Sequence, residues 1–272
     1  MKIQFLGTAA AEGFPAVFCN CEYCQKAREL GGKNIRTRSQ ALINDDLLLD
    51  FPADTYHHFL ENKIEGDKIK YLFITHSHGD HLYPGDLRLH GHVYAHNMRE
   101  ELFQVYCGSG AYEKISDAGW LPQGIEVNVI EPYRTVTVGD YEVTALPARH
   151  AKGDGALFYV IRGEKTILYA HDTGYFYDEV FAFMEAKGMV FDMVSLDCTN
   201  VEIPITDEGS HMGVDNVARV LKRLEEIGAV TDNTIKYVNH FSHNGNPQHH
   251  ILEGLVAKYG CNVSYDGCCV EL

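Results

Sequence analysis

The chain has 272 residues, 45% of them hydrophobic, and its 23 Lys and Arg against 38 Asp and Glu give a formal net charge of −15 at neutral pH. This acidic balance argues against a broad binding surface for long nucleic acid or for an anionic membrane, because both attract basic proteins. No apolar run approaches the roughly 18–20 residues that span a bilayer, and residues 1–16 are typical of a strand and a turn rather than a signal peptide, so we expect a cytoplasmic protein.

Short apolar runs alternate with amphipathic helical patterns along the chain. Strands are expected at residues 2–6, 46–50, 70–75, 125–130, 135–138, 141–146, 157–161, 166–170, 191–197 and 235–239. Gly139-Asp140 and Gly163-Glu164 are typical of hairpin turns. Apolar residues at helical spacing predict helices around residues 180–184, 217–227 and 251–256. No repeat or linker divides these elements, so we expect one α/β domain over residues 1–272, with sheets covered by helices.

The most informative segment lies between Lys70 and Leu82, where an apolar strand leads directly into four side chains that bind metals. These side chains are His76, His78, Asp80 and His81. Imidazole nitrogen and carboxylate oxygen are good ligands for Zn, Mn and Fe, and several must converge to hold an ion. A strand end provides a rigid base, while the following loop lets alternate side chains turn inward. The pattern therefore predicts a metal site, with two groups serving each of two ions.

The T-H-x-H-x-D-H pattern of residues 75–81 resembles the signature of the metallo-β-lactamase superfamily. The resemblance continues in order down the chain with His150, Asp172 and His240, each directly after a predicted strand. It implies a metallo-β-lactamase fold, a four-layer αββα sandwich, with two divalent ions, Zn or Mn. By this resemblance one ion is held by His76, His78 and His150. The other is held by Asp80, His81 and His240, with Asp172 bridging the pair.

Polar residues near these strands receive weaker assignments. Asp50, which follows the apolar run 47–49, matches a superfamily aspartate that steadies the metal loop by hydrogen bonding, although a helix-capping or turn role is open for it.

Three further histidines, His90, His92 and His96, receive no ligand role. The short run between the last two histidines predicts a strand.

Three of the eight cysteines, Cys19, Cys21 and Cys24, form a C-x-C-x-x-C pattern. In a reducing compartment this spacing suits a tetrahedral zinc ion with a fourth ligand from elsewhere, whereas a redox pair or free thiols are the alternatives. The cluster resembles those of the PhnP-type phosphodiesterases and the PqqB proteins. In the first group the fourth zinc ligand is a histidine three residues after the last active-site histidine. That spacing makes His243 the candidate for a structural zinc site, with a solvated loop position as the alternative.

The PhnP-type group also carries a histidine at the start of a late helix, where it is proposed to act on the leaving group. His211, ahead of the helical pattern at 217–227, matches that residue. A histidine that titrates near neutral pH suits a general acid, and a helix-start position without a catalytic role is the alternative. Asp80 is the second candidate catalytic residue, in addition to its role as a ligand.

The resemblance as a whole implies a dinuclear metal-dependent hydrolase. The predicted reaction is hydrolysis of a small or cyclic phosphodiester, with Arg149 or Lys152, on either side of His150, available to bind phosphate. A PqqB-like biosynthetic protein, a tRNA 3′-processing endonuclease and a non-catalytic metal-binding protein remain alternatives. The tRNA-processing branch needs an extended basic arm, and this acidic chain contains no long basic insertion. The expected partners are thus a small phosphodiester and a second copy in a homodimer, with no membrane and no long nucleic acid.

Overall fold

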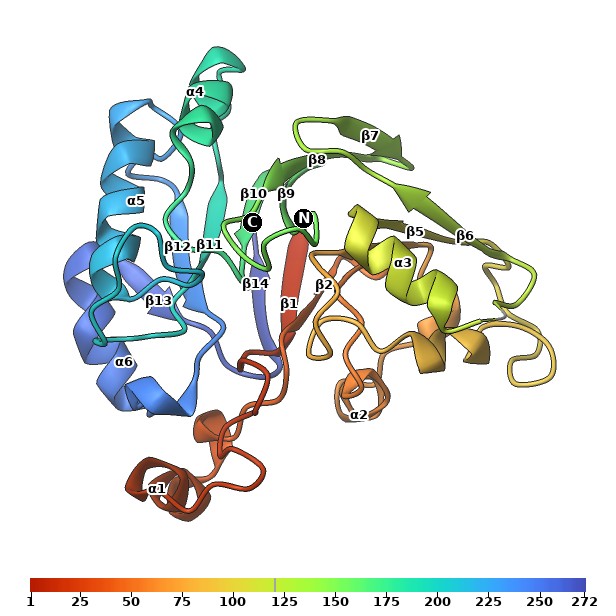
Figure 1. Cartoon of the computed structure of the whole chain (residues 1–272), viewed down its shortest axis with the longest axis horizontal. Helices are drawn as coiled ribbons and strands as arrows, with labels where there is room; N and C mark the ends of the chain where they lie inside the picture. The colour runs from red at the N-terminus through yellow and green to blue at the C-terminus, as the bar shows by residue number, and fades with distance from the viewer. Residues whose placement is uncertain (120) are drawn as a thin grey trace.

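The computed structural model describes residues 1–119 and 121–272, and contains two seven-stranded sheets (Figure 1). The first sheet has the order β14 (Cys268–Glu271), β1 (Lys2–Gly7), β2 (Gln40–Ile43), β3 (Leu47–Leu49), β4 (Tyr71–Ile74), β5 (Phe103–Cys107) and β6 (Ile125–Val129). The second has the order β13 (Cys261–Val263), β12 (Ile235–Asn239), β11 (Met193–Asp197), β10 (Thr166–Ala170), β9 (Leu157–Arg162), β8 (Tyr141–Pro147) and β7 (Thr135–Val138). Strands β3 to β6 and β10 to β13 are parallel, and the remaining pairs are antiparallel.

Helices cover the outer faces of both sheets. The second sheet is covered by α4 (Asp178–Ala186), α5 (Val214–Glu226) and α6 (His249–Val256), and the first by α2 (Thr55–Glu61) and α3 (Ser109–Asp117) (Figure 1). The remaining helix, α1 (Glu22–Leu30), projects from one end of the molecule (Figure 1). Short 3-10 helices are η1 (Gly32–Asn34), η2 (Gly66–Lys68), η3 (Pro84–Leu89), η4 (His243–Gly245) and η5 (Ala257–Tyr259). The expected four-layer αββα sandwich is confirmed.

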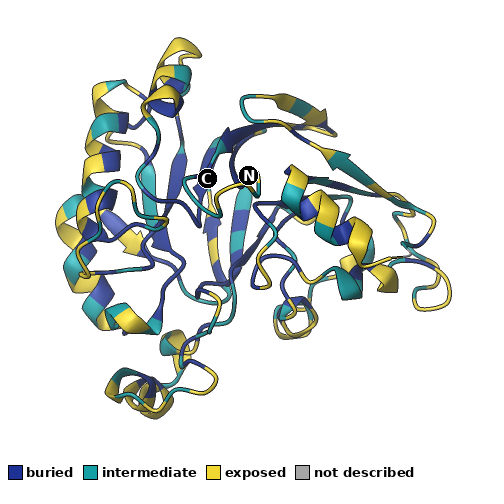
Figure 2. Cartoon of the chain, viewed as in Figure 1, coloured by how far each residue is buried: buried dark blue, intermediate teal, exposed yellow. Residues whose placement is uncertain are grey.

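Most of the core lies in three apolar layers, one between the sheets and one under each set of helices, and a fourth, smaller cluster packs around Cys24 of α1. Successive side chains of a strand point to opposite faces. In β4, Phe73 faces the other sheet, while Leu72 and Ile74 face the outer helices. Figure 2 shows the central strands largely buried, and the edge strands β6 and β7 and the outer sides of the helices exposed. Burial on both faces explains why the strands read as continuous apolar runs in the sequence.

Several elements differ from the sequence prediction. Strands β2, β5, β13 and β14 were not expected, because they are short or carry polar residues such as Gln40 and Asn262. The strand predicted between His92 and His96 is wrong. The backbone there turns instead, with the amides of Tyr94 and Ala95 donating to the carbonyl of Gly91 at 3.0 and 2.8 Å. These two amides are therefore not available to pair with a neighbouring strand.

The carboxyl ends of the central strands converge at one edge of the sandwich. A parallel bridge joins Ala9, beyond β1, to Phe241, beyond β12, and so connects the two sheets. A second bridge joins Phe51, beyond β3, to Leu82 in the loop after β4. The predicted ligand residues therefore meet where the two sheets are tied together. None of the helices in the described ranges is long and apolar enough to cross a membrane.

Candidate metal centre

Asp50 holds the loop that follows β4. Its fully buried carboxylate accepts hydrogen bonds from the backbone amide of Thr75 at 2.7 Å and from the Thr75 hydroxyl at 2.9 Å, and its second oxygen lies 2.7 Å from Nδ1 of His81. Asp50 itself adopts a left-handed backbone conformation with φ of +65°. The carboxylate thereby turns Nε2 of His81 toward the interior of the site. This geometry favours the steadying role over the capping role.

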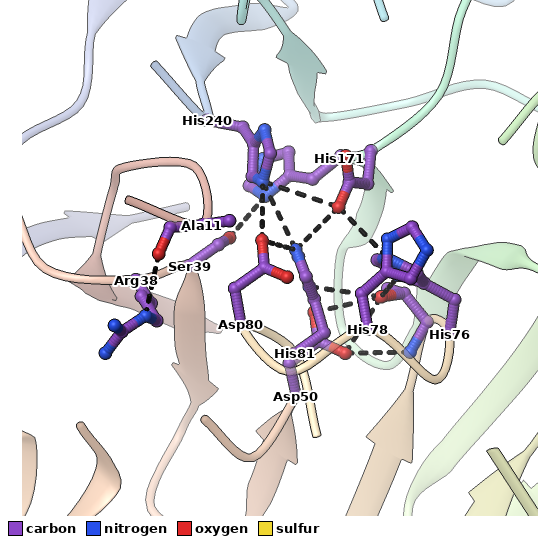
Figure 3. Close-up of polar contacts among 12 residues, drawn as sticks. Ala11, Arg38, Ser39, Asp50, His76, His78, Asp80, His81, His171 and His240 are labelled. Carbon is purple, nitrogen blue, oxygen red and sulfur yellow. Dashed lines mark hydrogen bonds and ion pairs between the residues drawn. The ribbon is translucent and has the colours of Figure 1, made fainter. Parts of the chain in front are cut away.

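Two groups of ligand atoms converge beside this loop. His76, His78 and His150 place one nitrogen each within 4.8 Å of one another, and Nε2 of His150 lies 3.1 Å from Nδ1 of His78. The second group contains four buried residues, Asp80, His81, Asp172 and His240. Figure 3 shows the side chains of Asp80, His81 and His240 pointing toward one another. The structure thus brings together all seven residues that the sequence analysis named as ligands of the two active-site ions.

Asp172 lies between the two groups. One of its carboxylate oxygens is 2.7 Å from Nε2 of His81 and 3.2 Å from Nε2 of His76, so it reaches a member of each group. Its backbone has φ of +55°, and its amide donates to Asp197 at 3.1 Å. The preceding residue, His171, points the other way, into the core, where its Nε2 lies 2.7 Å from the Ser195 hydroxyl. Only the aspartate of this pair faces the site.

The electrostatics of the centre are those of a site that accepts cations. Burial alone would raise the pKa of Asp172, but the surrounding imidazoles of His240, His81 and His76 hold it well below the usual range. Burial likewise opposes charge on His81, yet the carboxylates of Asp50, Asp172 and Asp80 raise its pKa well above the usual range. Burial lowers the pKa of His76, so that ring is neutral. Divalent metals bind ionised carboxylates and neutral imidazoles, so an ion held by His81 would displace a proton from its ring.

The unmet hydrogen-bonding capacity of the site fits divalent ions. Nε2 of His76 and Oδ1 of Asp172 are buried and make no hydrogen bond of good geometry, although they lie 3.2 Å from Oδ2 of Asp172 and 3.1 Å from Nδ1 of His211 respectively. Nε2 of His81 and Nε2 of His240 face each other at 3.2 Å. Buried polar atoms without partners are costly, and a cation shared between these atoms would satisfy them. The donor set of nitrogens and carboxylate oxygens therefore suits zinc or manganese.

Asp197 is a residue to which the sequence analysis assigned no role. It ends β11, is fully buried, and accepts hydrogen bonds from the amides of Thr199 at 3.0 Å and Met212 at 2.9 Å. Its other oxygen lies 3.2 Å from Nδ1 of His211. A carboxylate at the end of a buried strand, as at Asp50, was the signal that could have identified it. Asp197 thus fixes the orientation of His211 at the edge of the centre.

His211 is partly accessible at the edge of the site, with 24% of its side chain exposed. Its Nδ1 also lies 3.1 Å from Asp172. Burial would lower the pKa of His211, but the Asp197 carboxylate, with help from Asp172, raises the pKa to about 9. A ring held in this way carries a proton at neutral pH, as a general acid must.

The cysteine cluster forms a separate site at the base of α1. Cys19, Cys21, Cys24 and His243 bring their sulfur and nitrogen atoms within 4.8 Å of one another, and Nδ1 of His243 lies 3.8 Å from Cys21 Sγ and 3.7 Å from Cys24 Sγ. The amide of Ala16 donates to Cys24 Sγ at 3.3 Å. Burial opposes ionisation of Cys21, but hydrogen bonds from His243 and the Cys24 amide lower its pKa to about 6. Three thiols and one imidazole match a tetrahedral zinc site.

Comparison with known proteins identifies the family. Residues 48–240 match the family model described as the β-lactamase superfamily domain. The chain belongs to this superfamily. Its members are metal-dependent hydrolases and bind divalent metals, typically zinc. The match contains all seven residues of the metal centre and ends at His240, so the cysteine cluster and His243 lie outside it.

Two solved structures of similar fold align with this β-lactamase superfamily member over its whole length. A diphosphatase from the PhnP family aligns over 100% of this chain and 97% of its own, with a TM-score of 0.77 and 19% identity. Zn²⁺-bound PqqB from Methylobacterium extorquens aligns over 100% of both chains, with a TM-score of 0.76 and 18% identity. At these identities the likeness shows the fold alone.

Among curated relatives, Ribonuclease Z from a Picosynechococcus strain is 28% identical over 160 residues. The matched segment covers 55% of this chain and 44% of that protein. The chain thus spans less than half the length of this relative.

Proposed function

We propose that the protein is a dinuclear metal-dependent phosphodiesterase that acts on a small or cyclic phosphodiester. The observation that carries the proposal is the position of His211, which Asp197 holds against the bridging carboxylate of Asp172 at the accessible side of the centre. Because Nδ1 faces the two carboxylates, Nε2 is the nitrogen available to donate a proton. A leaving oxygen that develops negative charge beside His211 would receive that proton.

The proposed ligands are those that converge in the structure. His76, His78 and His150 hold one ion, and Asp80, His81 and His240 hold the other, with Asp172 shared between them. A pair of divalent ions supplies activated water and neutralises charge on a phosphoryl group. The buried carboxylate of Asp50, 2.7 Å from Nδ1 of His81, orients one of these ligands. Cys19, Cys21, Cys24 and His243 hold a structural zinc ion that ties α1 to the chain leaving β12.

The surroundings of the centre favour a small substrate. A cleft of about 500 Å³ beside His150 is lined in part by Lys152, Tyr177 and Ser210. Arg149 is already engaged, since its guanidinium contacts Glu208 at 2.8 Å and lies over the Tyr177 ring at 4.2 Å. Lys152 is exposed on the rim and is the side chain proposed to contact a substrate phosphate. The PhnP-family neighbour is a diphosphatase, which supports phosphate ester or anhydride chemistry at a site of this architecture.

A second candidate function is tRNA 3′ processing. The similarity to Ribonuclease Z over 160 residues favours it. The net charge of −15 opposes it, because a tRNA substrate requires extensive phosphate contacts.

A direct test compares the two substrates on the same preparation. The purified protein is supplied with Zn or Mn, its metal content is measured, and turnover is followed on bis(4-nitrophenyl) phosphate and on a precursor tRNA. We expect hydrolysis of the aryl diester and none of the tRNA. Absence of diester turnover in protein with two ions in the histidine site would refute the phosphodiesterase proposal. Efficient cleavage of the tRNA would establish the second candidate, while zinc in the cysteine site alone would indicate a non-catalytic protein.

A further inference from the structure

The first ion of the proposed pair has its three ligands on two separate loops. His76 and His78 lie on the loop after β4, and His150 lies on the loop between β8 and β9. His78 is exposed, whereas all four residues of the second group are buried. Packing therefore restrains the ligands of the second ion more than those of the first, and hydrogen bonds must fix the two loops of the first ion relative to each other.

The ring of His78 differs from the other imidazoles in how it is oriented. Nδ1 of His81 lies 2.7 Å from the Asp50 carboxylate. Nδ1 of His150 lies 3.1 Å from the carbonyl of Ser210. Within residues 1–119 and 121–272, the one hydrogen-bonding partner of the His78 ring is Nε2 of His150, another ligand, at 3.1 Å. The position of His78 therefore depends on the backbone that carries it.

Asp154 connects the two loops. It lies four residues after His150, and its carboxylate accepts hydrogen bonds from the amide of Ser77 at 2.9 Å and from the Ser77 hydroxyl at 2.5 Å. Ser77 is the residue between the two histidines of the other loop. The amide of Asp154 donates to the carbonyl of Ala151 at 2.9 Å, which holds Asp154 within the loop of His150. One side chain thus joins the loops that carry all three ligands of the first ion.

Helix α3 supports the same connection. Lys114 Nζ donates to the carbonyl of Ser77. The amide of Gly110 donates to the carbonyl of Asp154 at 2.9 Å. A Cβ atom at Gly110 would lie 2.1 Å from Asp154 Oδ1, so the helix can approach the carboxylate this closely because residue 110 is glycine. The amide, hydroxyl and carbonyl of Ser77 are thus all hydrogen-bonded, which fixes the backbone between the two histidines.

We propose that Asp154 is a positioning residue for the first ion, which it supports by hydrogen-bonding to Ser77. The second ion has a different support, because Asp50 orients His81 and the amide of Phe51 donates to the His81 carbonyl at 2.7 Å. Loss of Asp154 therefore weakens the first ion and leaves the second in place. This inference rests on the proposed ligands of the two ions and is independent of the substrate.

Mn²⁺ titrations of the full chain, followed by electron paramagnetic resonance, test the proposal. A chelator first removes bound metal. Thiolate ligands favour Zn²⁺ over Mn²⁺, so bound Mn²⁺ reports on the histidine centre. We expect the wild type to bind two Mn²⁺ with the spectrum of a coupled pair. Asp154→Ala should weaken one ion about 10- to 100-fold and change the other less than about twofold, so that intermediate Mn²⁺ concentrations give the spectrum of an isolated ion.

Two further variants separate positioning from charge. Asp154→Asn can accept from the Ser77 amide and donate to the Ser77 hydroxyl, so it should bind both ions within about threefold of the wild type. Gly110→Ala places a methyl group against Asp154 Oδ1 and should weaken the first ion as Asp154→Ala does. The matched control is Asp117→Ala, at an exposed position of α3 that lines the same cleft as Asp154, and it should behave as the wild type.

Wild-type affinity for both ions in Asp154→Ala would overturn the proposal. Equal loss of both ions, or an Asp154→Asn variant as weak as Asp154→Ala, would also overturn it. A wild type that binds fewer than two Mn²⁺ would refute the ligand assignment and this proposal with it. Failure of the proposed reaction gives a different result. Two bound ions, selective weakening in Asp154→Ala and no diester turnover would refute the phosphodiesterase and support the role of Asp154.

Discussion

His58 makes the stability of this protein depend on pH in a way that can be calculated. The side chain is 1% exposed on α2, and burial lowers the pKa of His58 to about 4. Its Nδ1 lies 2.6 Å from Gln40 Oε1, and its Nε2 lies 2.7 Å from the Thr37 hydroxyl. The amide group of Gln40 donates to Asp50 O at 2.9 Å, which leaves Oε1 to accept the proton of Nδ1. The neutral ring is therefore the form that the fold accommodates.

The unfolded chain binds a proton at His58 near the ordinary histidine pKa of about 6.5, whereas the folded chain does so only near pH 4. Between these values the unfolded state holds more protons, so acidification reduces the free energy of unfolding. The two pKa values predict a loss of about 2 kcal/mol at this one residue between pH 7 and pH 4.5. Burial raises the pKa of the nearby Asp266, which acts in the opposite direction but is present in wild type and variant alike.

Urea unfolding of the wild type and His58→Gln at pH 7 and pH 4.5 measures this contribution. His58→Gln should be less stable at pH 7, because buried hydrogen bonds are lost, and the difference between the two proteins should shrink by about 2 kcal/mol at pH 4.5. The matched control is His57→Gln at the exposed neighbouring position, which should behave as the wild type. Equal pH dependence of the wild type and His58→Gln would refute the reasoning.

Three further predictions concern the two metal sites. His211→Ala should retain bound metal but lower kcat on an aryl diester about 10²- to 10⁴-fold, and metal loss or unchanged kcat would contradict its role as general acid. Asp50→Asn should weaken metal binding about 10- to 100-fold, measured by competition with a chelator, because His81 loses its orienting carboxylate; unchanged affinity would count against that role. Cys24→Ser should remove one zinc per chain in elemental analysis, while Cys269→Ser, at an exposed cysteine outside the cluster, should not; zinc retained in Cys24→Ser would exclude Cys24 as a ligand.

The sequence pattern predicted those site residues that lie at or near the ends of strands. His76, His150, Asp172 and His240 each come directly after or near the end of an apolar run, and parallel strands bring such positions to one edge. The partner of His211 was not assigned, because Asp197 has no neighbouring ligand motif and acts only through contacts formed in the fold.

Other features depend on contacts between residues that are far apart in the sequence, and local sequence patterns do not show such contacts. Strand β2 consists of four buried residues including Gln40. The Gln40 side chain can be buried there because it forms hydrogen bonds with Asp50, Thr55 and His58. Arg149 was a candidate for binding phosphate, but Glu208 and Tyr177 occupy its guanidinium. Neither Glu208 nor Tyr177 lies close to Arg149 in the sequence, so only the folded structure could show the contacts.

The pairing of β1 with β14 has a consequence for how the protein is made. Ile3 pairs with Val270, and Phe5 pairs with Cys268. The hydrogen-bonding groups along one edge of β1 are therefore paired only by β14, a strand far away in the sequence. As the ribosome extends the chain, β1 keeps a free edge until β14 has emerged. Contacts so distant in sequence fold slowly, and an unpaired edge invites association with other chains. We therefore expect a nascent or truncated chain lacking β14 to be the form most dependent on chaperones.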